Sequence, residues 1–98
     1  MNDFNELING QKPTLVDFFA TWCGPCKMMH PVLEQLKDKM GDTVNIVKVD
    51  VDKNQELSAQ YRIQSVPTLM VFKGGEMKWR GAGVHQAADL ESKLKEYM

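Results

Sequence analysis

The chain has 98 residues, which is enough for one domain that buries a core without disulfide support. Its 12 basic and 13 acidic residues almost cancel, so no excess of charge favours nucleic acid or an anionic membrane surface as a partner. No apolar run approaches the roughly 20 residues of a membrane-spanning helix, and the first residues lack the basic and apolar regions of a signal peptide. We therefore expect a single domain over residues 1–98 in the cytoplasm, with a trimmed secreted precursor as the alternative.

The first two elements are predicted before the cysteines. A short helix is expected to begin at the capping-box-like segment Asp3 to Glu6 and to end at Gly10. The β-branched and aromatic run from Thr14 to Ala20 is typical of a strand that is buried on both faces. Asp17 lies in the middle of this apolar run, so its carboxyl group is a candidate functional group.

From Cys23 to about Met40 the apolar residues follow a helical period. The expected buried stripe consists of Met29, Val32 or Leu33, Leu36 and Met40. The remaining elements are a buried strand interrupted by Lys48, a weak helix, a hairpin of two strands joined at Gly74-Gly75, and a final helix. Their expected ranges are Val44 to Val51, Asp52 to Tyr61, Thr68 to Lys73, Met77 to Gly81 and Gln86 to Tyr97. This order predicts an α/β fold with a mixed sheet.

Both cysteines of the chain, Cys23 and Cys26, lie where a strand passes into a helix. A disulfide between them would close a ring of about four residues and stabilise the fold by only about 2 kcal/mol, so redox chemistry explains the pair better than bracing does. Zinc is the alternative, but His30 and His85 form no second ligand pair at the usual spacing, and we expect no metal site. We interpret His30 as a solvent-exposed helix residue and His85 as a loop residue.

The segment Trp22 to Lys27, preceded by Val16 to Ala20 and followed by Val66 to Thr68, resembles the thioredoxin family, in register from about Asp3 to the end. The resemblance implies a four-stranded mixed sheet flanked by helices on both faces. The implied strand order is second, first, third, fourth, with the third and fourth antiparallel to the others. The family's usual N-terminal edge strand is short or missing here, so the strand Val44 to Val51 is expected to be an exposed edge, or to be covered in a shorter way by the N-terminal residues.

Cys23 is expected at the N-terminal end of its helix, where unpaired amides and the helix dipole stabilise a thiolate nucleophile. Cys26, one turn deeper, then attacks Cys23 and releases the reduced substrate. From the residues alone, Asp17 is more simply a structural or solvated carboxylate. The resemblance implies instead that Asp17 accepts the Cys26 proton. Lys48 on the neighbouring strand either modulates the pKa of Asp17 or keeps its ammonium in water.

The resemblance also implies a substrate-binding surface around the cysteines. Pro67 would follow a cis bond, face the cysteine pair and leave the backbone of Val66 free to pair with an extended substrate, whereas a trans edge proline is the alternative from the residues alone. Gly24 allows close approach of a substrate backbone, and Pro25 suits an early helical position. The remaining residues assigned to this surface are Trp22, Thr68, Gly83 and Val84.

The family suggests a general protein-disulfide reductase that acts as a monomer on disulfide-containing client proteins. A thioredoxin reductase would recharge it, and NADPH would be a cofactor of that partner only, so this chain needs none. Gly-Pro between the cysteines resembles the reducing members of the family, and a disulfide oxidant or isomerase is the alternative. A third hypothesis is a non-catalytic binding subunit that uses the apolar rim formed by Trp22, Val66 and Gly83.

Overall fold

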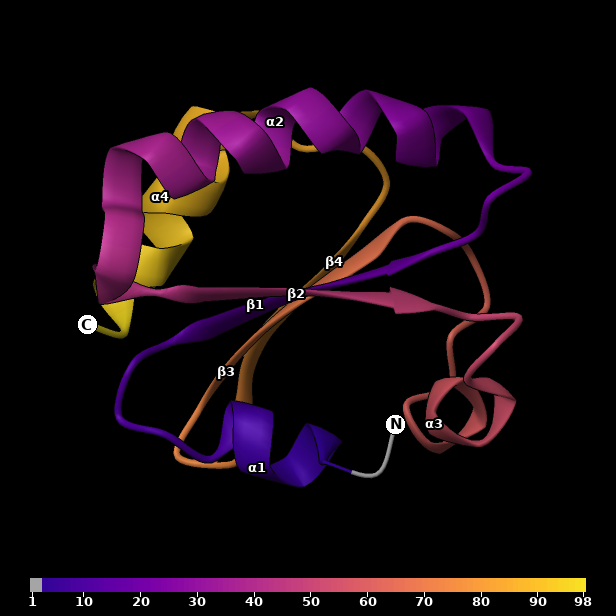
Figure 1. Cartoon of the computed structure of the whole chain (residues 1–98), viewed down its shortest axis with the longest axis horizontal. Helices are drawn as coiled ribbons and strands as arrows, with labels where there is room; N and C mark the ends of the chain where they lie inside the picture. The colour runs from indigo at the N-terminus through magenta and orange to yellow at the C-terminus, as the bar shows by residue number, and fades with distance from the viewer. Residues whose placement is uncertain (1–2) are drawn as a thin grey trace.

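The computed structural model describes residues 3–98 as a four-stranded sheet with helices on both faces, so the predicted fold class is confirmed (Figure 1). In chain order the elements are α1 (Phe4–Ile8), β1 (Thr14–Phe19), α2 (Gly24–Met40), the 3-10 turn η1 (Gly41–Thr43), β2 (Asn45–Asp50), α3 (Gln55–Gln60), β3 (Thr68–Lys73), β4 (Glu76–Ala82) and α4 (Ala87–Glu96). In Figure 1, α2 and α4 lie on one side of the sheet, and α1 and α3 lie on the other.

The strands are arranged in the order β2-β1-β3-β4. β1 pairs with β2 in parallel and with β3 in antiparallel orientation, and β3 pairs with β4 in antiparallel orientation. β4 therefore runs in the same direction as β1 and β2, and the expectation that both β3 and β4 oppose them is wrong for β4. The reason is the tight hairpin at Gly74 and Gly75, which reverses the chain once more.

β1 forms the centre of the core, and its residues from Thr14 to Phe18 are buried. Leu15 packs with the α2 and α4 residues Met29, Leu33, Leu36, Met40, Leu90 and Leu94. Val16 and Phe18 pack on the other face with Phe4 and Ile8 of α1. Since side chains alternate along a strand, Asp17 shares the face of Leu15 and is directed toward the α2 side.

β2 is an edge strand, and no strand precedes α1 within residues 3–98. Only Val49 of this strand is fully buried, so the prediction of a buried strand over Val44 to Val51 is wrong for most of its length. The cause is position, because an edge strand has a neighbour on one side only. Lys48 is one of the exposed residues of β2.

The predicted capping box of α1 is not formed, because the side chain of Asp3 makes no capping hydrogen bond. Its backbone, with φ −107° and ψ 16°, is not in the extended conformation from which an N-cap side chain reaches the first amides. The helix ends at Ile8, before Gly10. The carbonyl groups of Ile8 and Gly10 accept hydrogen bonds of 3.0 Å from Gly75 and Gly74, which attach the β3–β4 turn to the loop after α1.

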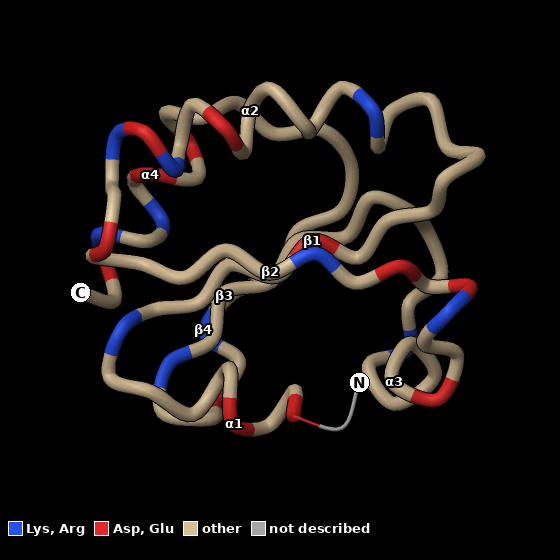
Figure 2. Tube along the Cα trace, viewed as in Figure 1, with Lys and Arg blue, Asp and Glu red and all other residues tan. Residues whose placement is uncertain are grey.

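The charged residues show no segregation by sign in the part of the chain that Figure 2 colours, since α2 and α4 each carry both acidic and basic positions. Over residues 3–98, no helix has the length and apolar character needed to cross a membrane. The sheet instead supplies a rigid platform, at one end of which β1 enters α2 and the cysteines lie.

Candidate active site

Cys23 and Cys26 are joined by a disulfide at the start of α2. Cys23 is the N-cap residue in extended conformation, and its sulfur accepts a hydrogen bond of 3.1 Å from the backbone N–H of Cys26. Cys23 is 5% exposed and Cys26 is 1% exposed, so Cys23 is the more accessible sulfur. An amide that already points at this sulfur, together with the helix N-terminus, stabilises negative charge on it when the disulfide is reduced.

Gly24 and Pro25 form the first turn of α2, as expected. Proline is suited to this position because its missing N–H has no helical acceptor there. A Cβ atom on Gly24 would meet no atom of the chain within 4 Å. The absence of a side chain at Gly24 therefore relieves no internal contact.

A second loop reaches the disulfide from the other end of the chain. The Val66–Pro67 peptide bond is cis, as predicted. The Sγ atom of Cys23 lies 3.6 Å from the carbonyl oxygen of Val66. The hydroxyl of Thr68 donates a 2.6 Å hydrogen bond to the Ser65 carbonyl, and Thr68 is buried, so this loop is fixed to the start of β3.

A third loop follows β4 and joins the second. The N–H of Gly83 donates a 2.8 Å hydrogen bond to the carbonyl oxygen of Pro67, and Gly83 has a φ of +86°, which is favourable for glycine alone. The next residue, Val84, is 43% exposed and adds apolar surface. His85 turns back, with Nδ1 2.9 Å from the Gly83 carbonyl and its ring edge-on to Trp79.

Trp22 precedes the disulfide and is 71% exposed. Its indole Nε1–H donates a 2.9 Å hydrogen bond to Oδ2 of Asp52, which orients the ring. A hollow of about 360 Å³ is lined by Trp22, Val51, Ile63, Gln64, Ser65 and Val66. An exposed indole, rather than a core residue, therefore borders an apolar hollow next to the cysteines.

Asp17 is 1% exposed, and both of its carboxylate oxygens lack a hydrogen-bond partner within residues 3–98. Desolvation by burial raises the pKa of Asp17 to about 6, and the positive charge of Lys48 partly opposes this rise. Asp17 and Lys48 are register partners across the β1–β2 pair, where Figure 2 shows an acidic position beside a basic one. The site thus holds a buried carboxyl group whose pKa is raised to about 6.

Comparison with known proteins identifies the family to which the chain belongs. The thioredoxin family model matches residues 1–96. The chain belongs to the thioredoxin family. It is 47% identical to a thioredoxin-like protein of Synechocystis over 98% of this chain and 92% of the relative. It is 44% identical to the thioredoxin of Alicyclobacillus acidocaldarius over 98% and 91% of the two chains.

Solved thioredoxin structures have the same fold. The thioredoxin of Malassezia sympodialis superposes with a TM-score of 0.87 at 35% identity, over 98% of this chain and 84% of that one. A mutant thioredoxin of Halobacterium salinarum superposes with a TM-score of 0.89 at 33% identity, over 99% and 84%. The chain is therefore a thiol-disulfide oxidoreductase whose redox group is the Cys23–Cys26 pair, and thioredoxins need no further cofactor for this chemistry.

Two parts of this thioredoxin site were missed by the sequence analysis. The hollow also uses Val51, Ile63, Gln64 and Ser65, for which closeness in sequence to Pro67 or to the end of β2 is the only signal. His30 is exposed, as expected, but its Nδ1 lies 3.0 Å from the Lys48 ammonium, and its ring lies edge-on to Phe19. Helical periodicity carries no information about this contact, because Lys48 belongs to a different element.

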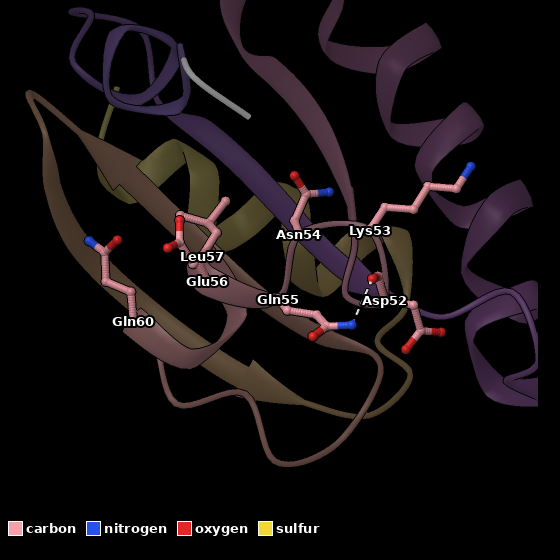
Figure 3. Close-up of a pocket in the computed structure, with 7 residues that line it drawn as sticks. All are labelled: Asp52, Lys53, Asn54, Gln55, Glu56, Leu57 and Gln60. Atoms are coloured by element: carbon pink, nitrogen blue, oxygen red, sulfur yellow. Dashed lines mark hydrogen bonds between the residues drawn. The ribbon is translucent and has the colours of Figure 1, made fainter.

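A larger hollow of about 540 Å³ lies over α3 (Figure 3). It is lined by Asp52, Lys53, Asn54, Gln55, Glu56, Leu57 and Gln60. Figure 3 shows the Gln55 amide directed at the Asp52 backbone, where Nε2 donates a 3.3 Å hydrogen bond to the carbonyl oxygen. No group of three potential metal ligands occurs within residues 3–98.

Proposed function

We propose that the chain is a general protein-disulfide reductase, recharged by an NADPH-dependent thioredoxin reductase. The observation that carries this proposal is the disulfide at the N-terminus of α2, with the Cys26 N–H 3.1 Å from the Cys23 sulfur. An amide and a helix N-terminus directed at one sulfur stabilise its thiolate, which is the nucleophile that attacks a client disulfide.

Cys23 begins the exchange. Its thiolate attacks one sulfur of a client disulfide, the client S–S bond breaks, and the other client sulfur leaves as a thiolate that takes a proton from solvent. Cys26 loses its proton and attacks the Cys23 sulfur. The mixed disulfide breaks, the client leaves with its second thiol, and two electrons have passed from this chain to the client.

Asp17 is the proposed acceptor of the Cys26 proton, and Lys48 modulates it. A group whose pKa is about 6 is ionised at neutral pH and still basic enough to take a proton from a thiol. The apolar surroundings and the lack of a hydrogen-bond partner support proton exchange as the use of this carboxyl group, since a purely structural carboxylate would be paired.

The client is proposed to bind as an extended segment across the three loops. The carbonyl oxygen of Val66, 3.6 Å from the Cys23 sulfur, is available to pair with the client backbone. Client side chains enter the hollow beside Trp22. The other residues proposed to contact the client are Gly24, Pro25, Gly83 and Val84, whereas the buried Pro67 and Thr68 are proposed to hold the Val66 carbonyl in place for it. We further propose that the chain acts as a monomeric single domain in the cytoplasm.

Reduction of insulin by NADPH and a bacterial thioredoxin reductase tests the proposal, with Cys23→Ser as the inactive control. The equilibrium of the pair with glutathione should give a potential near −270 mV, the value known for thioredoxin. A potential near −180 mV, as in protein disulfide isomerase, would identify an oxidant or isomerase instead. No turnover together with tight binding of a partner would identify a binding subunit.

A further inference from the structure

Lys48 has two possible partners for its ammonium group. One is Asp17, its register partner on β1, whose side chain is on the same face of the sheet. The other is His30 on α2, the helix that covers this face.

The Lys48 ammonium forms a hydrogen bond with His30 and none with Asp17. Its Nζ atom lies 3.0 Å from Nδ1 of His30. Within residues 3–98, both carboxylate oxygens of Asp17 lack any hydrogen-bond partner, so the ammonium does not reach them. An ammonium group within bonding distance is the usual neutraliser of a buried carboxylate, and here it is directed elsewhere.

The contact requires a particular form of the imidazole. An ammonium group only donates, so the contact forms when Nδ1 of His30 is the acceptor and the ring hydrogen is on Nε2. The edge-on contact with Phe19, with ring centroids 6.4 Å apart, holds the ring over the end of β1. A second proton on the ring would remove the acceptor and place two positive charges next to each other.

We propose that His30 is a positioning residue that holds the Lys48 ammonium away from Asp17, and that removal of the imidazole releases the ammonium toward the carboxylate. This inference rests on the proposed role of Asp17 as the proton acceptor. A released Lys48 ammonium stabilises the charged carboxylate, so Asp17 then remains a base at lower pH than it otherwise would.

Other charged groups also face the Lys48 ammonium. The groove beside it is lined by Glu34 and Lys37 of α2 and by Asp42 of η1, and Asp50 follows on the same face of β2. Glu34 and Asp42 are exposed, so their carboxylates are hydrated and attract the ammonium only weakly. The buried carboxylate of Asp17 gains much more from an approaching positive charge, because little water competes for it.

The test is the carboxyl carbon NMR titration of Asp17 in the oxidised protein. His30→Ala should raise the acid dissociation constant of Asp17 about tenfold, because a freed Lys48 approaches it. Lys48→Met should lower that constant. In the double variant the constant should equal that of Lys48→Met alone, because His30 acts only through Lys48.

Two further variants control for charge and for the helix surface. His30→Gln keeps an acceptor for the ammonium and should retain the parent titration. Glu34→Gln, one turn along α2, should leave it within about twofold. Three results would each overturn the inference. The acid dissociation constant of Asp17 could fall or stay unchanged in His30→Ala, or His30→Gln could behave like His30→Ala. His30→Ala could also change this constant by the same factor when Lys48 is already replaced by Met. The titration requires no turnover, so these outcomes are independent of whether the protein reduces insulin.

Discussion

The Cys23 sulfur lies 3.6 Å from the carbonyl oxygen of Val66, so the more accessible atom of the disulfide faces the backbone of a loop 43 residues away. If a client segment binds along this loop, as we propose, we expect it to reach Cys23 before Cys26. This geometry supports the proposed order of attack, in which Cys23 attacks the client disulfide and Cys26 then attacks Cys23.

In the reduced protein, iodoacetamide should alkylate Cys23 much faster than Cys26, because Cys23 is at the open helix end and Cys26 lies beneath it. Cys26→Ser should accumulate mixed disulfides with client proteins, since the resolving thiol is gone. Cys23→Ser is the matched control and should trap none. Mass-mapped labelling that finds equal rates, or Cys26 ahead, would reverse the assignment of the two roles.

Asp17→Asn should slow the attack of Cys26 on the mixed disulfide by about 10²–10⁴-fold, because asparagine keeps the shape but accepts no proton. The initial attack by Cys23 should change little. Single-turnover kinetics with a disulfide peptide between pH 6 and 9 separates the two steps. A resolution rate equal to that of the parent protein over this range would make Asp17 a structural residue.

The same substitution should increase stability at neutral pH. Burial raises the pKa of Asp17 from its ordinary value of 3.8 to about 6, so the folded state binds the proton more tightly than the unfolded state. The stability that this protonation contributes is present below about pH 4 and is lost as the pH rises through about 6. At pH 8, Asp17→Asn should therefore gain up to about 3 kcal/mol in free energy of unfolding.

This gain should fall below about 1 kcal/mol at pH 4, because Asp17 is then protonated in the folded state and partly protonated in the unfolded state. Urea unfolding at pH 4 and pH 8 measures the difference. Asp38→Asn, at an exposed position of α2, removes the same charge and should change stability by less than about 0.5 kcal/mol at either pH. Equal gains for Asp17→Asn at both pH values would show that packing, and not ionisation, is responsible.

Gly83→Ala should destabilise the protein by about 1 kcal/mol and weaken client binding, because alanine is strained at a φ of +86° and the loop carries the hydrogen bond to Pro67. The matched variant is Gly24→Ala, in α2, where φ is not positive and a Cβ atom would meet nothing within 4 Å. It should leave stability unchanged or slightly higher, because alanine is the better helix former. Urea unfolding of the two variants side by side decides the point.

Asp52→Ala should raise the KM for a disulfide peptide about two- to tenfold, because the Trp22 indole loses its 2.9 Å hydrogen bond and its fixed orientation. Asp52→Asn keeps an acceptor and should lie close to the parent. The rate of iodoacetamide reaction at Cys23 should be unaffected in both variants. A change of kcat without a change of KM would mean that Asp52 acts on the chemistry and not on the rim.

The local signals in the sequence determined most of the fold. The uninterrupted apolar run of β1, the helical stripe of α2 and the glycine pair of the hairpin depend on neighbouring residues only, so each element was predicted within a few residues. The Cys-x-x-Cys spacing and its flanking residues indicated the chemistry for the same reason. The capping box of α1 did not form, because the backbone of Asp3 is not in the extended conformation of an N-cap residue.

Only the tertiary structure decided which distant groups meet. The apolar pattern of β2 is typical of a buried strand, yet most of β2 is only partly buried, as the resemblance implied for a strand at the edge of the sheet. Asp17 reads as one carboxylate in an apolar run, and its raised pKa comes from the helix-covered sheet that removes water from it. His30 reads as a solvated helix residue, and it acquires Lys48 as a partner because α2 crosses the face of β2. These contacts join elements that are far apart in the chain, so periodicity and spacing cannot encode them.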